Sequence, residues 1–173
     1  MTTRFKPLLS LFLAAAVLLP GPAAAQITVS FYSHELGNSF PHAFIVLSGT
    51  PEGGGPAVNA NFGFTAKSVT PAILMGPVYG VIKSANDGYV RHSDRKFTMA
   101  ISDRQYAALN ALIEKWRTLP GKSYDLNRRN CTHFVGEAAE ALGLKVVFDQ
   151  KLMKKPRSFL ESVIRLNPVL GGH

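Results

Sequence analysis

The chain has 173 residues, a formal net charge of +8 and 46% hydrophobic residues. This length excludes two domains of ordinary size once an export signal is removed, and it suits one domain with a real core. The positive charge favours contact with anionic surfaces such as cell-wall polymers or lipid head groups. Because Lys and Arg are scattered, with one cluster at 154–157, no nucleic-acid partner is predicted.

Residues 1–25 have the pattern of a secretory signal peptide. Arg4 and Lys6 precede an apolar stretch at 8–19, and the small residues 23–25 predict cleavage before Gln26. The stretch is short for a membrane span, which needs about 20 apolar residues. An uncleaved anchor is the less favoured alternative, because the Pro and Gly residues at 20–22 break the helix. We therefore expect a periplasmic or secreted protein without a transmembrane segment in the mature chain.

The first half of the mature chain has the pattern of a β-sheet. Its apolar runs are short, rich in Val, Ile, Phe and Tyr, and separated by Gly, Pro, Asn and Asp. These runs predict strands at residues 28–33, 43–48, 58–64, 80–83 and 96–101. The glycine-rich segment 49–56 is predicted to be a surface hairpin loop.

The second half has the pattern of helices. Ser102 and Gln105 form a capping box, and apolar residues recur behind it at three- and four-residue spacing until Pro120. A second helix is predicted at 130–142, ended by Gly143, and a third at 157–166. The pattern therefore predicts a single α+β domain over residues 26–173, with helices packed on a sheet.

The mature chain carries one cysteine, Cys131, directly after Asn130. In an oxidising compartment a lone thiol is either buried and inert or kept for its chemistry. Asn130 is a good N-cap, which places Cys131 in the first turn of its helix. The helix dipole and free N–H groups there lower a thiol pKa and favour the nucleophilic thiolate. The alternative, a small buried hydrophobic side chain, is equally open at this point.

A thiol nucleophile needs a base, which directs attention to the histidines. His42 directly precedes the apolar run 43–47, which is typical of a buried central strand, so its ring would be held at a rigid strand edge. His34, after the first strand, is the reserve candidate. His133 follows Cys131 by two residues and is turned about 200° around the helix from it. His92 is expected at the surface, and His173 is the terminal residue.

A histidine that opens a buried strand, followed far downstream by Asn130-Cys131-Thr132-His133-Phe134-Val135, resembles the circularly permuted papain-like superfamily. This group includes NlpC-type cell-wall peptidases, lecithin retinol acyltransferase-like proteins and PPPDE-like peptidases. The resemblance covers about 42–143 and implies a papain-like (permuted) antiparallel sheet packed against helices. It implies Cys131 as nucleophile, His42 as general base, and a polar side chain on the following strand that orients the imidazole. Asn61 is the preferred candidate for that side chain, and Asn59 is the alternative.

The resemblance implies acyl-transfer chemistry, most often amide hydrolysis. Export and positive charge make peptidoglycan stem peptides the first expected substrate, so the chain is predicted to be a cysteine peptidase or amidase. Two alternatives stay open. A lipid-directed acyltransferase or thioesterase would use the same pair, with the segment 69–78 as an apolar lip, although a loop or short helix packed on the sheet is the favoured interpretation of that segment. A binding module would use the fold without catalysis. No cofactor is predicted, and one cysteine without clustered histidines does not favour a zinc site.

Overall fold

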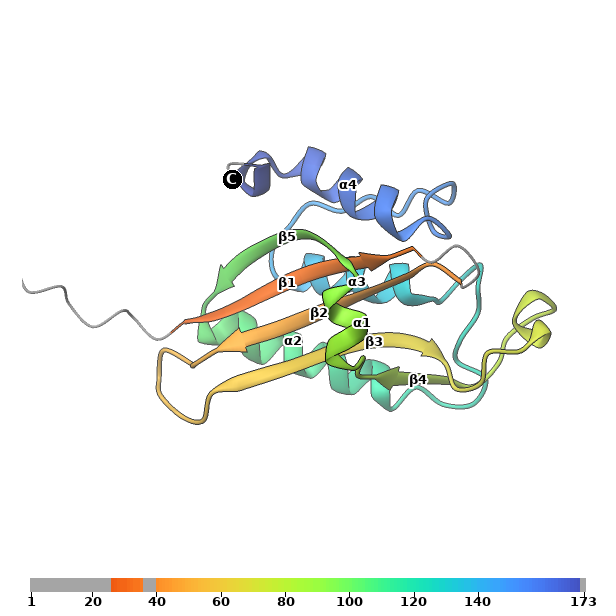
Figure 1. The fold of residues 1–173 in the computed structure, drawn as a ribbon, viewed down its shortest axis with the longest axis horizontal. Helices are drawn as coiled ribbons and strands as arrows, with labels where there is room; N and C mark the ends of the chain where they lie inside the picture. The colour runs from red at the N-terminus through yellow and green to blue at the C-terminus, as the bar shows by residue number, and fades with distance from the viewer. Residues whose placement is uncertain (1–25, 36–39, 172–173) are drawn as a thin grey trace, which may run out of the picture.

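The computed structural model describes residues 26–35 and 40–171. The predicted signal peptide and His173 lie outside the described residues. The described chain forms a single α+β domain, in which a five-stranded antiparallel sheet packs with four helices (Figure 1). The predicted fold class is confirmed at this level.

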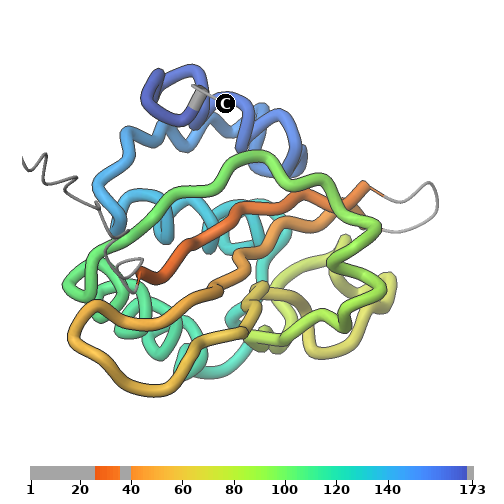
Figure 2. The backbone as a smooth tube through the Cα atoms, turned by 60° about the vertical axis from the view of Figure 1, so that its left-hand side comes forward, coloured from red at the N-terminus to blue at the C-terminus, as the bar shows by residue number. Residues whose placement is uncertain are grey.

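The strands are β1 (Ile27–His34), β2 (His42–Gly49), β3 (Val58–Ala66), β4 (Gly80–Lys83) and β5 (Asp94–Ile101). Their order in the sheet is β4-β3-β2-β1-β5, so β2 is the central strand. All five strands were predicted, and each boundary differs from the predicted one by two residues or fewer. After β4, at one edge of the sheet, the chain crosses to the opposite edge and forms β5 there. Figure 2 shows β5 running beside β1.

Side-chain alternation gives the sheet two different faces. On one face the strands bury apolar residues such as Ala43, Ile45 and Leu47 in the hydrophobic core. Helices α2 (Asp103–Arg117) and α3 (Cys131–Ala141) lie behind this face in Figure 1. Helix α4 (Pro156–Leu166) packs along β1 and β5. We call the opposite side of the sheet the front face.

The front face is crossed by a short helix that the sequence pattern did not predict. Helix α1 (Asp87–Arg91) lies in front of the sheet in Figure 1, on the connection from β4 to β5. None of its five residues is buried, so the helix has no apolar face and the sequence has no apolar periodicity that would predict it. Asn86 starts the helix by accepting a hydrogen bond from the Tyr89 N–H at 2.8 Å. The 3₁₀ segment η1 (Pro71–Leu74) lies in the segment 69–78, for which a loop or short helix was expected, whereas the 3₁₀ segment η2 (Pro168–Gly171) was not predicted.

Helix α3 begins at a side chain that serves several partners. The Asn130 Oδ1 accepts from the N–H groups of Thr132 and His133, at 2.9 and 3.3 Å. Its Nδ2 donates to the carbonyl oxygens of Leu126 and Met153, both at 2.8 Å. Asn130 is buried, so water cannot take the place of its side chain in these hydrogen bonds. The residue therefore connects the start of α3 to the two loops that contain Leu126 and Met153.

Among the described residues, no helix has the length and apolar character that a membrane span requires.

We predict that Asn130→Ala lowers the free energy of unfolding by about 2–4 kcal/mol, because it removes a helix cap and leaves the buried Met153 carbonyl and the part-buried Leu126 carbonyl without their side-chain partner. Urea unfolding followed by circular dichroism measures this loss. The matched control is Asn127→Ala, at an exposed position of the same loop, which should change the free energy of unfolding by about 0.5 kcal/mol or less. Equal effects of the two substitutions would contradict the role of Asn130 as the cap of α3.

Candidate functional site

Cys131 is the first residue of α3 and is 5% exposed. Its Sγ lies 4.0 Å from the Thr132 Oγ1. Burial raises the pKa of the thiol, although the Ala43 backbone N–H, the Thr132 hydroxyl and the N–H groups of the helix start oppose this shift. Of the two readings that the sequence left open, burial of the sulfur is the one that the structure shows, and a lowered thiol pKa is not found. The sequence showed the favourable helix start but not the desolvation of the sulfur.

His42 is the first residue of β2, and its ring packs on β3. A Cβ atom at position 63 would lie 2.5 Å from the His42 Nε2, so the ring occupies space that only glycine leaves free there. Burial, followed by the nearby His34, lowers the pKa of His42 from 6.5 to about 4. The imidazole is therefore neutral at neutral pH and can accept a proton.

Cys131 and His42 are both associated with the start of β2. The Ala43 N–H that stabilises the thiolate belongs to the residue directly after His42. The Ala43 side chain faces the core below α3, whereas His42 and Phe44 alternate to the front face, where their rings are stacked with centroids 6.1 Å apart. Among the described contacts no hydrogen bond joins the thiol to the imidazole. The structure thus brings the two predicted residues to the same strand end without forming their bond.

Asn61 lies on the front face of β3, but it binds backbone rather than an imidazole. Its Nδ2 donates to the Ala85 carbonyl at 3.1 Å, and its Oδ1 accepts from the Ala85 N–H at 2.6 Å. Both amide atoms hold the segment that leads into α1. Asn59, the alternative, is exposed.

The other histidines within the described residues have structural partners. His133 belongs to the cap of α3, where its Nδ1 accepts from the Asn130 N–H at 3.3 Å. His92 is exposed, as predicted, and its Nδ1 lies 2.7 Å from the Gly88 carbonyl. His34 is buried on the front face, with its Nδ1 2.7 Å from the Ser93 Oγ and its Nε2 without a partner.

The front face holds a cavity of about 710 Å³, which we call the front cavity. His42 lines it together with two tyrosines that sequence reasoning did not select, Tyr89 of α1 and Tyr124 of the loop before α3. Burial and the neighbouring Cys131 raise the pKa of both phenols, that of Tyr89 to about 12. Cys131 contributes to both shifts but does not itself line the cavity. No sequence signal identified Tyr89, because α1 was not predicted.

One rim of the front cavity is apolar and exposed. Phe40 and Val69 line the cavity and are both exposed, and the exposed side chains of Leu74, in η1, and of its C-cap Met75 follow a few residues later. Lys67 and Lys83 also belong to the cavity wall. The opening therefore combines apolar side chains with positive charge.

Within the part of the chain that the structure describes, no group of three or more His, Cys, Asp or Glu side chains is arranged to hold a metal ion. Searches of protein-family models, curated proteins and solved structures found no match to this chain.

We predict that the protein loses stability as pH falls from about 6.5 to about 4, because the unfolded chain protonates His42 over this range while the folded chain does not. The full effect of this residue is about 3 kcal/mol, and it is absent above pH 6.5. His34 and His133, whose pKa values are also lowered by burial, add to the slope. Urea unfolding at pH 7, 6, 5 and 4 tests this, with His42→Gln as the comparison. The free energy of unfolding of His42→Gln should decline less steeply as pH falls than that of the wild type. Identical slopes for the two proteins would contradict the lowered pKa of His42.

Proposed function

We propose that this protein is an exported thiol hydrolase that cleaves an amide bond through an acyl-enzyme on Cys131. The observation that carries the proposal is the convergence of the only cysteine and His42 at the first residues of β2, beside the front cavity. The thiol stands at a helix start and the imidazole at a strand start, two rigid positions for reacting groups.

The arrangement supports the resemblance to circularly permuted papain-like proteins. A central antiparallel strand begins with a histidine, and the helix that begins with the cysteine packs against that strand and its neighbour β3. In this proposal the histidine strand precedes the cysteine helix in the chain, which is the order that permutation produces. Residues 26–173 would form this domain, and residues 1–25 would direct it to the periplasm or the medium.

The proposed reaction begins with both groups neutral. Burial raises the pKa of the thiol and lowers that of the imidazole, which disfavours an ion pair at rest. His42 therefore acts as a general base that removes the thiol proton as the sulfur attacks. Since no hydrogen bond joins them in this structure, the ring has to move from its place on Gly63, or a water molecule has to bridge. Such contacts often tighten when substrate binds.

The atoms of the proposed step balance without a cofactor. The Sγ forms a bond to the acyl carbon, and its proton passes to His42. The C–N bond then breaks, and His42 returns the proton to the leaving amine. Water attacks the resulting thioester, which releases the acid and restores the thiol.

Peptidoglycan stem peptides are the substrate class that we propose. They carry free carboxylates, which Lys67 and Lys83 in the cavity wall would attract. The positive charge of the chain would also favour contact with anionic cell-wall polymers.

We predict that Cys131→Ala and Cys131→Ser abolish release of peptide fragments from purified peptidoglycan, a loss of about 10³-fold or more, because no other thiol can form the acyl-enzyme. His42→Gln should reduce the rate by about 10²-fold or more through loss of the base. Chromatography of soluble fragments measures the rate, and urea unfolding confirms that each variant folds. Undiminished release by folded Cys131→Ala would refute the proposal.

The apolar rim favours a second candidate, a lipid-directed acyltransferase or thioesterase with the same Cys131 and His42. Val69 lines the cavity, and Leu74 and Met75 are exposed a few residues further along the chain, where an acyl chain or membrane surface would contact them. The two candidates differ in substrate and share the nucleophile.

For this candidate we predict that Leu74→Ser/Met75→Ser weakens binding to phosphatidylglycerol vesicles by about 10²-fold, measured by sedimentation, because each of the two exposed apolar side chains that enters lipid contributes about 1.5 kcal/mol. Val169→Ser, at an exposed apolar position outside the segment 69–78, is the matched control. If the wild-type protein stays in the supernatant, or if the control loses as much binding, the rim has no role at a membrane.

A further inference from the structure

Helix α1 is held firmly although it contributes nothing to the core. None of its five residues is buried. Nevertheless Asn86 caps it, and the Asn61 side chain fixes Ala85 just before it through two hydrogen bonds. A surface segment with so many specific contacts is positioned for something other than packing.

The contacts converge on Tyr89. The Ser93 hydroxyl donates to the Tyr89 carbonyl oxygen at 2.7 Å, and the His34 ring stacks on the phenol ring with centroids 3.9 Å apart. Because the Ser93 hydroxyl proton is used in this bond, the Ser93 oxygen accepts a hydrogen bond from the His34 Nδ1–H. This bond orients the His34 ring so that it stacks on the Tyr89 ring. The phenol ring also packs against Phe44 of β2, at 5.8 Å between centroids.

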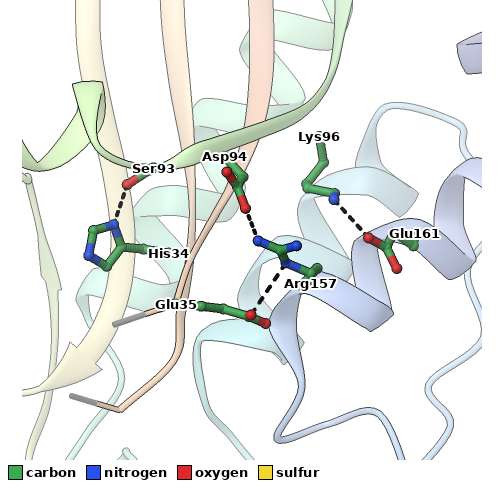
Figure 3. Close-up of polar contacts among 7 residues, drawn as sticks. All are labelled: His34, Glu35, Ser93, Asp94, Lys96, Arg157 and Glu161. Carbon is green, nitrogen blue, oxygen red and sulfur yellow. Dashed lines mark hydrogen bonds and ion pairs between the residues drawn. The ribbon is translucent and has the colours of Figure 1, made fainter. Parts of the chain in front are cut away.

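The other end of this network is tied to α4. Figure 3 shows Ser93 bonded to His34, and beside it Asp94 paired with Arg157, which also pairs with Glu35 at 3.3 Å. Lys96 of β5 pairs with Glu161 of the same helix at 2.8 Å. These ion pairs join β5 to α4 directly after Ser93, the residue that contacts both His34 and Tyr89.

The Tyr89 hydroxyl itself has no hydrogen-bond partner among the described residues. Its ring lines the front cavity with His42 and packs on Phe44, the residue after Ala43, whose backbone N–H contacts the Cys131 sulfur. With a pKa of about 12 the phenol keeps its proton at neutral pH and remains a donor. A rigid, neutral O–H group near the nucleophile suits an oxygen that becomes negative.

We infer that Tyr89 is a catalytic hydrogen-bond donor, whose hydroxyl binds the carbonyl oxygen of the substrate as Cys131 attacks the acyl carbon. This inference rests on the proposed thiol hydrolase function. When the S–C bond forms, the electron pair of the C=O bond moves to oxygen, and the Tyr89 O–H stabilises that charge without transferring its proton. The pair returns to carbon as the leaving group departs.

Two reagents separate this role from a general effect on the thiol. Acylation of Cys131 by p-nitrophenyl acetate creates an oxyanion, whereas alkylation by iodoacetamide does not, although both consume the same sulfur. Tyr89→Phe keeps the ring and removes only the hydroxyl. We expect it to slow acylation about 10²-fold and to leave the alkylation rate within about twofold of wild type. Tyr32→Phe, in the same aromatic cluster but not in the cavity wall, should change neither rate.

Each other outcome has a definite meaning. If Tyr89→Phe lowers the acylation and alkylation rates equally, or changes neither rate, the inference is wrong. If Tyr124→Phe slows acylation and Tyr89→Phe does not, the donor is Tyr124, which also overturns it. If Cys131→Ala still reacts with p-nitrophenyl acetate as fast as wild type, the proposed function itself fails, which is a separate result. Ser93→Ala, which loosens the hold on Tyr89, should slow acylation less than Tyr89→Phe does.

Discussion

The contact between the start of α3 and the start of β2 is the constraint on which the candidate site depends. Asn130 caps the helix and binds two loop carbonyls, which fixes where the helix begins. The next residue then places its sulfur against the Ala43 amide, one residue from His42. Shifting the helix start by one residue would turn the sulfur about 100° away from β2.

Burial controls the chemistry as strongly as position does. The packing that seats α3 on the sheet removes water from Cys131 and keeps its thiol protonated, and the same desolvation keeps His42 neutral. Helix dipole and backbone N–H groups act in the opposite direction on the sulfur, but they do not outweigh the loss of solvent. A site of this kind relies on proton transfer during the reaction rather than on a stored ion pair.

The front face shows how polar residues that resemble catalytic groups can serve positioning. Asn61 and His34 were candidates because of their side-chain chemistry and their places beside strands. In the fold they contact the connection between β4 and β5, through Ala85, Ser93 and the Tyr89 ring. That connection has to cross the sheet because its two strands lie at opposite edges. The crossing brings Tyr89 to the front cavity.

The sequence by itself determined the five strands, the three long helices and the placement of Cys131 at a helix start, because periodicity, capping residues and turn residues act over a few positions. It also identified His42 as a strand-edge residue. It did not reveal α1 or Tyr89, since five unburied residues leave no periodic pattern, and it left open whether the thiol is buried. Those features depend on which strands become neighbours and on how much water each group loses. Both are consequences of contacts between residues far apart in the chain, and only the tertiary structure decides them.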